Sequence, residues 1–295
     1  MVVVAGASGN TGSRTVSMLL KRGEKVLAFA RSAEKLTFLK DQGAQIRTGD
    51  LGNVDFLTSV LKDADAAYLL IPPRLDAIDI HQYYIDMAQV IFNAIVRSGI
   101  KKMVFLSSLG AEKPSDTGVV LGLHDVEIVL GRLTHVDIVF LRCSSFMQNT
   151  LSSISLIKQQ HFFGGIVDPN IPVYMCDTRD IGDKAAELLA QRAFPGHSVL
   201  DLFGDRLSFR EASHIIGMQI GMPDLPYIRF KDTDALAEYV DIGFSQSVAQ
   251  SYIDLARAIS QGKINPTITD PSKPTTTTTF LKFVKEVFLP FYNKK

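Results

Sequence analysis

The stretch VVVAGASGNTGSRTV at residues 2–16 places three glycines directly behind an apolar run. Glycine loses the most chain entropy on folding, so three of them at regular intervals need a structural reason. In a strand–turn–helix unit, the first glycine lets the chain reverse, the second lets the backbone approach a ligand, and the third lets the helix pack on the strand. The helix N-terminus behind them offers unpaired N–H groups and a positive dipole end, which suit a pyrophosphate. The residues predicted to contact a nucleotide in this turn are Gly6, Ser8, Gly9, Asn10, Thr11 and Gly12.

The spacing of these glycines is G-x-x-G-x-x-G rather than the dinucleotide fingerprint G-x-G-x-x-G, and a glycine pattern alone is a weak signal. Its context favours a phosphate-binding turn over a merely structural one, because the apolar run ends at residue 5 and a helical pattern opens near residue 11. A P-loop is excluded, since no Lys followed by Ser or Thr closes the pattern.

Downstream of the turn, short β-rich apolar runs alternate with longer helical patterns. Each run is nearly continuous in apolar residues, as expected when helices cover both faces of a parallel sheet. Short connections between such units force right-handed crossovers. We therefore predict an α/β fold with a doubly wound parallel sheet, a Rossmann domain, over residues 1–143. The predicted strands are 2–5, 25–30, 44–47, 66–71, 102–106 and 137–141, and the predicted helices are 11–20, 33–40, 54–61, 81–97 and 123–131.

After residue 143 the alternation of apolar runs and helical patterns becomes less regular, and we predict a smaller C-terminal α/β lobe over residues 144–295. This lobe is expected to bind substrate or a partner and to return some elements to the Rossmann core. Residues 144–160 suit a helix, residues 161–172 a loop that covers a ligand, and the threonine-rich segment 266–279 a solvated connector. Thr279 is predicted to be the N-cap of a last helix. The other predicted helices are 181–191, 209–220, 234–240, 247–259 and 280–288, with strands at 198–203 and 227–230.

The composition excludes several classes of partner. Apolar residues make up 46% of the 295, and 31 basic groups balance 31 acidic ones, so no overall charge attracts nucleic acid. No stretch reaches the roughly 18 uninterrupted apolar residues of a membrane span, and the first strand leaves no room for a leader. The two cysteines, Cys143 and Cys176, lack metal-ligand spacing. We expect a cytoplasmic protein with no metal site, no membrane span and no direct nucleic-acid partner.

The residue after the second strand indicates which dinucleotide is bound. A site selective for NAD(H) places Asp or Glu there to bind the ribose 2′-hydroxyl, but this chain has Arg31. A guanidinium binds a 2′-phosphate and stacks on adenine, so NADP(H) is favoured over NAD(H). An ordinary surface arginine is the alternative. Asp50, in TGDLGN after the third strand, is predicted to lie at the adenine edge, with a turn-forming aspartate as the alternative.

Further motifs follow in a specific order along the chain. They are GDL at 49–51, IPP at 71–73, SSLGA at 107–111, LRCSSFMQN at 141–149 and TTTTTFLKFVKEVF at 275–288. Together with the glycine turn and Arg31, they make the chain resemble the NmrA-like family of atypical short-chain dehydrogenase/reductases. The resemblance implies NADP(H) bound across the carboxyl edge of a Rossmann sheet. Some members of the family reduce quinones, dyes or plant phenolic ethers, whereas others sense the NADP(H) redox state and bind protein partners.

The resemblance also implies further cofactor contacts. The resemblance adds Leu51, next to Asp50, and places Ile71, Pro72 and Pro73 at the pyrophosphate and ribose. It also implies that Ser107 and Ser108 approach the nicotinamide and that Phe146 closes over the nicotinamide. The prolines and serines directly follow predicted parallel strands, and ligands of open α/β sheets bind at such carboxyl ends. A rigid loop at the prolines and a polar turn at the serines are the alternatives.

The catalytic motif of the typical short-chain enzymes is absent. They use a Tyr-x-x-x-Lys pair on the helix after such serines, but residues 117–130 read TGVVLGLHDVEIVL. His124 is the predicted proton donor, because an imidazole ordinarily titrates near neutral pH, and Ser108 is the second candidate. A helix-start histidine capped by or paired with Asp125 is the alternative. The one Tyr-x-x-x-Lys of the chain, Tyr227 to Lys231, lies far downstream and is attributed to chance.

Hydride transfer to a quinone needs no such pair, because the nicotinamide is the reductant and water can supply protons. The predicted function is therefore NADP(H)-dependent reduction of a quinone-like or conjugated carbonyl compound. The alternative is an NADPH redox sensor that binds a protein partner, and isomerase or epimerase chemistry is disfavoured.

A pocket for a flat apolar substrate is predicted from Phe146, Met147, Phe162, Phe163 and Met175, with core packing as the alternative. The apolar helix at 82–97 suits either the sheet or a second subunit, so the oligomeric state stays open.

Overall fold

Seven strands form the central sheet of the computed structural model, which describes residues 1–294. The strand order is β10-β6-β5-β4-β1-β2-β3, so it reverses between β1 and β4 as in a doubly wound sheet. All neighbouring strands run parallel. The predicted α/β Rossmann fold is confirmed. The strands are β1 (Val2–Val4), β2 (Val26–Ala30), β3 (Gln45–Thr48), β4 (Ala66–Leu69), β5 (Lys102–Ser108), β6 (Asp137–Cys143) and β10 (His197–Leu202).

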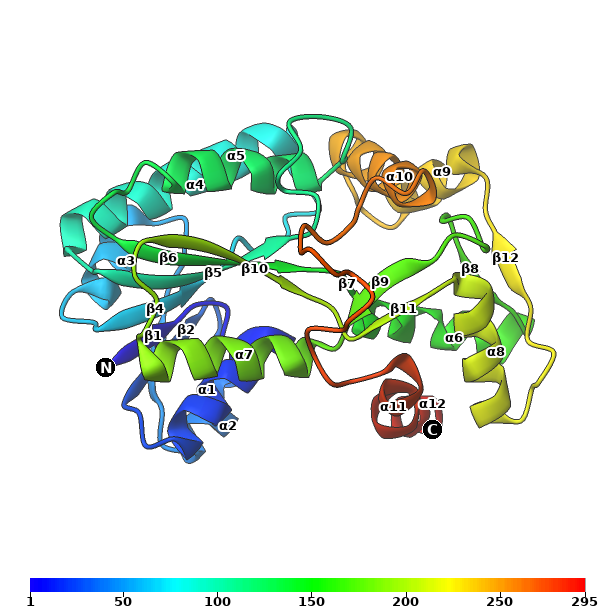
Figure 1. Ribbon diagram of the computed structural model, residues 1–295, viewed down its shortest axis with the longest axis horizontal. Helices are drawn as coiled ribbons and strands as arrows, with labels where there is room; N and C mark the ends of the chain where they lie inside the picture. Colours follow the sequence, from blue (N-terminus) through cyan, green and yellow to red (C-terminus); the bar gives the residue numbers. More distant parts are fainter. Residues whose placement is uncertain (295) are drawn as a thin grey trace.

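Helices cover both faces of this sheet, which explains its nearly continuous apolar strands. Along β1, Val3 packs into one core cluster and Val2 and Val4 into the other, because successive side chains of a strand point to opposite faces. In Figure 1, α4 and α5 lie above the sheet and α1 and α7 lie below it. The first layer contains α3 (Val54–Leu61), α4 (Ile80–Ser98) and α5 (Val120–Leu130), and the second contains α1 (Asn10–Lys21), η1 (Glu34–Leu36), α2 (Thr37–Asp41) and α7 (Thr178–Gln191).

The chain after β6 contributes both to the central sheet and to a smaller lobe. Helix α7 packs on α1, and β10 pairs with β6 so that Leu200 lies opposite Leu141. The lobe has its own core, in which Phe163, Phe280 and Phe283 are buried. Its elements are β7 (Ser145–Phe146), η2 (Met147–Ser153), α6 (Ile154–Gln160), β8 (Phe163–Gly165), β9 (Val173–Cys176), β11 (Asp205–Leu207), α8 (Phe209–Ile220), β12 (Tyr227–Arg229), α9 (Asp232–Asp241), α10 (Gln246–Ser260), α11 (Phe280–Phe283), η3 (Val284–Phe288) and α12 (Leu289–Tyr292).

Two segments of the lobe differ from the sequence-based prediction. Residues 144–160 form a strand, a 3₁₀ segment and a short helix instead of one helix, and residues 161–172 contain β8 instead of being only a loop. Strand β7 pairs with β9, and β8 pairs with β12. These partners lie far away in the sequence, and such pairing decides strand formation more than local propensity does. Within residues 1–294, the structure contains no helix with the length and apolar character needed to cross a membrane.

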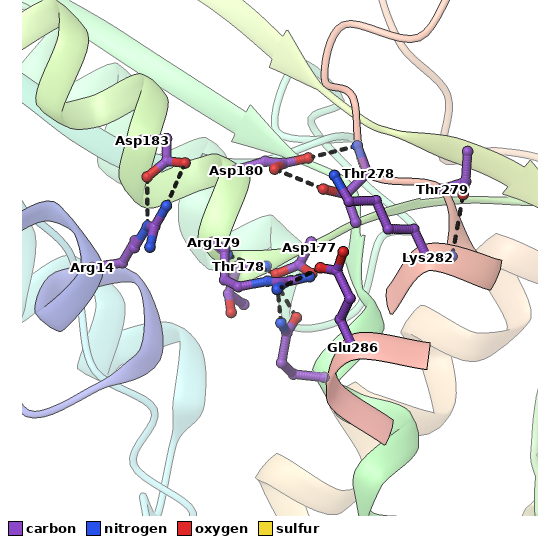
Figure 2. Close-up of polar contacts among 11 residues, drawn as sticks. Arg14, Asp177, Thr178, Arg179, Asp180, Asp183, Thr278, Thr279, Lys282 and Glu286 are labelled. Atoms are coloured by element: carbon purple, nitrogen blue, oxygen red, sulfur yellow. Dashed lines mark hydrogen bonds and ion pairs between the residues drawn. The ribbon is translucent and has the colours of Figure 1, made fainter. Parts of the chain in front are cut away.

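The threonine-rich connector is not simply solvated, and the prediction was wrong for its last part. Thr278 is 3% exposed, and its amide and hydroxyl donate to the two carboxylate oxygens of Asp180 on α7, at 3.0 and 2.9 Å (Figure 2). Thr275 accepts a hydrogen bond from the Phe203 amide and donates its own amide to the Phe203 carbonyl. The predicted cap is confirmed, because the Thr279 hydroxyl accepts from the Lys282 amide at the start of α11. The connector therefore fastens the C-terminal helices to α7.

The contact between Thr278 and Asp180 gives a test of this attachment. In Thr278→Val, Asp180 loses one donor in a buried place, so we expect the free energy of unfolding to fall by about 1 kcal/mol. The neighbouring Thr277 is exposed, so Thr277→Val is the matched control and should stay within about 0.5 kcal/mol of the wild type. Urea unfolding measures both. Equal effects of the two substitutions would contradict a specific role for Thr278.

Candidate cofactor and substrate site

The glycine turn between β1 and α1 has the backbone geometry that its sequence predicts. Gly6 adopts a left-handed conformation with φ +58°, and its carbonyl accepts a hydrogen bond from the Gly9 amide at 2.9 Å. A Cβ atom at Gly12 would lie only 2.4 Å from the Gly6 carbonyl oxygen, so a larger residue would push the helix away from the strand. No side chain caps α1 at Gly9, which leaves the first N–H groups of the helix available to a ligand. The turn fits a pyrophosphate.

The polar side chains of this turn point to different places. Ser8, Gly9 and Asn10 are exposed, whereas Thr11 is 6% exposed and accepts a hydrogen bond from the Tyr68 hydroxyl at 3.0 Å. The Thr11 side chain therefore lies against β4. Of the predicted side-chain donors, Ser8 and Asn10 remain exposed at the turn.

A hollow of about 100 Å³ lies beside the turn, at the carboxyl ends of the neighbouring strands. Arg31 is exposed there and forms no ion pair within residues 1–294. Asp50 accepts a hydrogen bond from the Gly52 amide at 2.8 Å, so it does form a turn, as its alternative interpretation predicts. The predicted residues that line this hollow are Gly6, Ser8, Arg31, Asp50, Leu51 and Pro72, and those missed by sequence reasoning are Phe29, Ala30, Gly49 and Leu70. The missed residues all flank strand ends, which is the signal that could have found them.

The segment after β4 borders the same hollow through Pro72 alone. The Pro72 carbonyl accepts a hydrogen bond from the Tyr83 hydroxyl of α4 at 2.8 Å, which holds this loop against the helix. Ile71 is buried in the core, and Pro73 is exposed. The structure thus separates the three residues of the IPP motif, and only Pro72 lies at the hollow.

Ser107 belongs to a buried polar network that the sequence did not reveal. Its hydroxyl donates to Glu127 of α5 at 2.5 Å, and Arg142 of β6 binds the same carboxylate through two nitrogens at 3.1 and 2.6 Å. Burial lowers the pKa of Arg142, but the hydrogen bond and charge of Glu127 outweigh this effect and the pKa rises. The guanidinium therefore stays charged. Ser108 lies outside this network, and its hydroxyl donates to the Leu109 carbonyl at 3.0 Å.

His124 does not make the contact with Asp125 that the sequence offered as an alternative. Its Nδ1 is 2.8 Å from the Ala111 carbonyl oxygen rather than paired with Asp125. A carbonyl oxygen only accepts hydrogen bonds, so Nδ1 carries the proton and Nε2 of the neutral ring has none. His124 can therefore donate a proton from Nε2 only when the ring is cationic.

A second cavity, of about 290 Å³, lies in the lobe between η2, β8, β12, α9 and α10. Phe146, Phe163 and Met175 line it, but Phe163 and Met175 are also buried in the lobe core, as the alternative predicted. Met147 is buried in the same core, and Phe162 contacts Phe230 edge to face. The cavity walls also include Phe209, Tyr227, Tyr239 and Tyr252, which sequence reasoning missed as pocket residues. Tyr227 thus lies in a cavity wall, while Lys231 directly precedes α9. The aromatic lining suits a flat ligand.

A larger groove, of about 690 Å³, lies elsewhere, between α1, α2, η2, α7 and the C-terminal helices. Of the predicted site residues, Asn10 alone lines it. Two of its cationic side chains are already paired, Arg14 with Asp183 and Arg179 with Asp177 and Glu286 (Figure 2). We therefore place the candidate site at the glycine turn, the neighbouring hollow and the aromatic cavity.

Comparisons with known proteins identify an NAD(P)H-binding domain in this chain. Residues 6–141 match a family described as NAD(P)H-binding. The chain has the fold of the NADPH-dependent quinone oxidoreductase of Escherichia coli crystallised with NADPH, with a TM-score of 0.80, 22% identity and coverage of 98% of this chain and 100% of that one. It is 24% identical over 261 residues to the NAD(P)H azoreductase of Xenophilus azovorans, covering 86% of both chains.

A further relative is the photosystem II assembly factor Ycf39 of Synechocystis sp. The two are 27% identical over 202 residues, which cover 66% of this chain and 61% of that protein. The fold and the glycine turn define this chain as a Rossmann-type NAD(P)H-binding protein. The family match spans residues 6–141, less than half of the chain, so it shows an NAD(P)H-binding domain, and the solved structures share the fold that the predicted resemblance implies.

Proposed function

We propose that this protein is a cytoplasmic NADPH-dependent reductase of quinone-like or other conjugated carbonyl compounds. The observation that carries the proposal is the aromatic cavity beside Phe146 in a chain that binds NAD(P)H. Bound NADPH would supply a hydride, which together with one proton from water converts a quinone into a hydroquinone and leaves NADP⁺. The role of the protein is then mainly to position the two reactants.

The chain's own residues have the following proposed roles. The turn from Gly6 to Gly12 binds the pyrophosphate through backbone amides, and Arg31 binds the 2′-phosphate. Ser107 donates to Glu127, which Arg142 binds in turn, so Ser107 would support the nicotinamide end of the site without supplying a free proton. Phe146 belongs to the wall of the aromatic cavity and would separate it from the cofactor. His124 and Ser108 are the proposed proton donors, with water as the other source.

Two similar proteins support this proposal. One is described as a quinone oxidoreductase and the other as an azoreductase, and each is matched over most of its length. Quinones and azo compounds are both flat and conjugated. The absence of a Tyr-x-x-x-Lys pair near Ser107 within residues 1–294 suits such acceptors, because their reduction needs less help from a specific acid than that of a simple ketone.

The proposal is tested by mixing the protein with NADPH and a panel of benzoquinones and naphthoquinones. We expect the nicotinamide absorbance to fall faster than in buffer for at least one acceptor, and the rate to scale with protein concentration. A panel without any acceleration would rule out the proposed activity. Heat-denatured protein is the control for direct reaction between NADPH and the quinone.

The preference for NADPH is tested at Arg31. Removing one or two charge-assisted hydrogen bonds to a 2′-phosphate should weaken NADPH binding about ten-fold or more in Arg31→Ala. NADH lacks that phosphate, so its affinity should stay nearly unchanged. Calorimetry measures both constants, and Lys21→Ala, an exposed residue at the other end of α1, controls for net charge. Equal weakening of both dinucleotides would contradict the proposed role.

A second candidate function is a regulator whose bound cofactor changes its affinity for a protein partner. The similarity to an assembly factor favours it, although that match spans only 61% of the relative. We expect such a regulator to capture different proteins from a cell extract when loaded with NADP⁺, with NADPH or with neither. Identical sets of captured proteins in all three conditions would remove this candidate.

A further inference from the structure

Three tyrosines line the aromatic cavity of the lobe, and two of them have unused hydroxyls. The Tyr227 hydroxyl donates to the Val167 carbonyl at 3.1 Å. In the part of the chain that the structure describes, Tyr239 and Tyr252 make no hydrogen bond through their hydroxyls, although both side chains are half-buried. Neither hydroxyl oxygen is fully buried, so both stay open to a bound molecule. Two unpaired phenolic donors in one cavity wall can therefore donate to a ligand that accepts hydrogen bonds.

The rings that carry these hydroxyls are held firmly. Tyr239 of α9 stacks on Phe244, with ring centroids 5.1 Å apart and planes 11° apart. Tyr252 of α10 packs against both, at 5.8 Å from Phe244 and 6.3 Å from Tyr239. Such contacts fix the side-chain rotamers, so the hydroxyls need little reorganisation when a ligand binds.

A second aromatic group forms another part of the cavity wall. Phe209 stacks on Tyr227 with ring centroids 5.3 Å apart, and Phe163 lies edge to face with Tyr227. Gly165 makes room for this group, since a Cβ atom there would lie 2.6 Å from the Tyr227 hydroxyl. The cavity thus offers broad apolar contact to a planar ring, while Tyr239 and Tyr252 provide its unpaired phenolic donors.

The charges of the residues that line the cavity further limit the class of ligand that it suits. None of its lining residues within 1–294 is Asp, Glu, Lys or Arg. Burial raises the pKa of the Tyr239 and Tyr252 phenols, so both stay protonated at neutral pH and act as donors rather than anions. An uncharged wall gives a cation no counter-charge to replace its lost hydration. The cavity therefore suits a neutral ligand better than a cationic one.

From these observations we infer that Tyr239 and Tyr252 are specificity-determining residues that donate hydrogen bonds to an oxygen of a neutral, planar acceptor. This inference rests on the proposed reductase function and deepens it. It makes carbonyl-bearing rings such as quinones, rather than cationic dyes, the substrate class of the site. The two tyrosines select and orient the acceptor, and they transfer no proton.

The test compares ligands and variants of the full chain. Calorimetry without NADPH measures binding of 1,4-naphthoquinone, of naphthalene, which has the same rings without oxygen, and of the cationic dye malachite green. We expect the wild type to prefer naphthoquinone over both. Tyr239→Phe and Tyr252→Phe keep the rings and remove one hydroxyl each, so each should weaken naphthoquinone about three- to ten-fold and leave naphthalene unchanged. In turnover with NADPH, KM should rise while kcat changes less than two-fold.

Tyr292→Phe is the matched control, because Tyr292 lies on α12 and outside the cavity lining. Thermal melting and NADPH affinity should be unchanged in all variants. The inference is overturned if wild-type protein binds naphthoquinone no better than naphthalene or malachite green, or if neither tyrosine variant alters its affinity or KM. Tight, tyrosine-dependent binding without turnover would instead refute the reductase proposal and support the inference, so the two failures are distinguishable.

Discussion

The close approach of Gly12 to the Gly6 carbonyl is the constraint on which the rest of the site depends. At this point α1 starts directly behind β1, and a Cβ atom at Gly12 would lie 2.4 Å from the Gly6 oxygen. The contact places the uncapped end of α1 at the carboxyl edge of the sheet, next to the point where the strand order reverses. Because the hollow with Arg31 and Asp50 lies on the adjacent strand ends, this backbone contact places the glycine turn beside the residues that line the hollow.

A set of polar contacts on α7 connects this half of the molecule with the C-terminal helices. Arg14 of α1 binds Asp183 through two nitrogens, while Asp180, one turn earlier, binds Thr278 (Figure 2). Arg179 links the fully buried Asp177 to Glu286. Exposed ion pairs contribute only about 0–1 kcal/mol each, but buried and shared ones fix orientation. The contacts therefore hold the lobe, and with it the aromatic cavity, in a defined position relative to α1.

The polar groups around Ser107, near the carboxyl edge of the sheet, and the lining of the aromatic cavity differ in charge. The Ser107 hydroxyl donates its hydrogen bond to Glu127, and Arg142, whose pKa is raised mainly by Glu127 against the effect of burial, binds the same carboxylate. The aromatic cavity, in contrast, has no charged lining within residues 1–294. The uncharged wall of this cavity suits the proposed hydride transfer to a conjugated ring, because such an acceptor disperses the added charge over its own atoms.

The sequence by itself determined the layout of the Rossmann half. Continuous apolar runs and glycine spacing are local signals, so they located the six strands up to β6, the turn at Gly6 and the cap at Thr279. Only the tertiary structure decided which residues from separate segments come into contact. These are Ser107 with Glu127, Thr278 with Asp180, and Tyr239 and Tyr252 with the cavity around Phe163. These partners are distant in sequence. Periodicity records which side of an element is buried, but not which other element covers it, since that depends on packing of the whole fold.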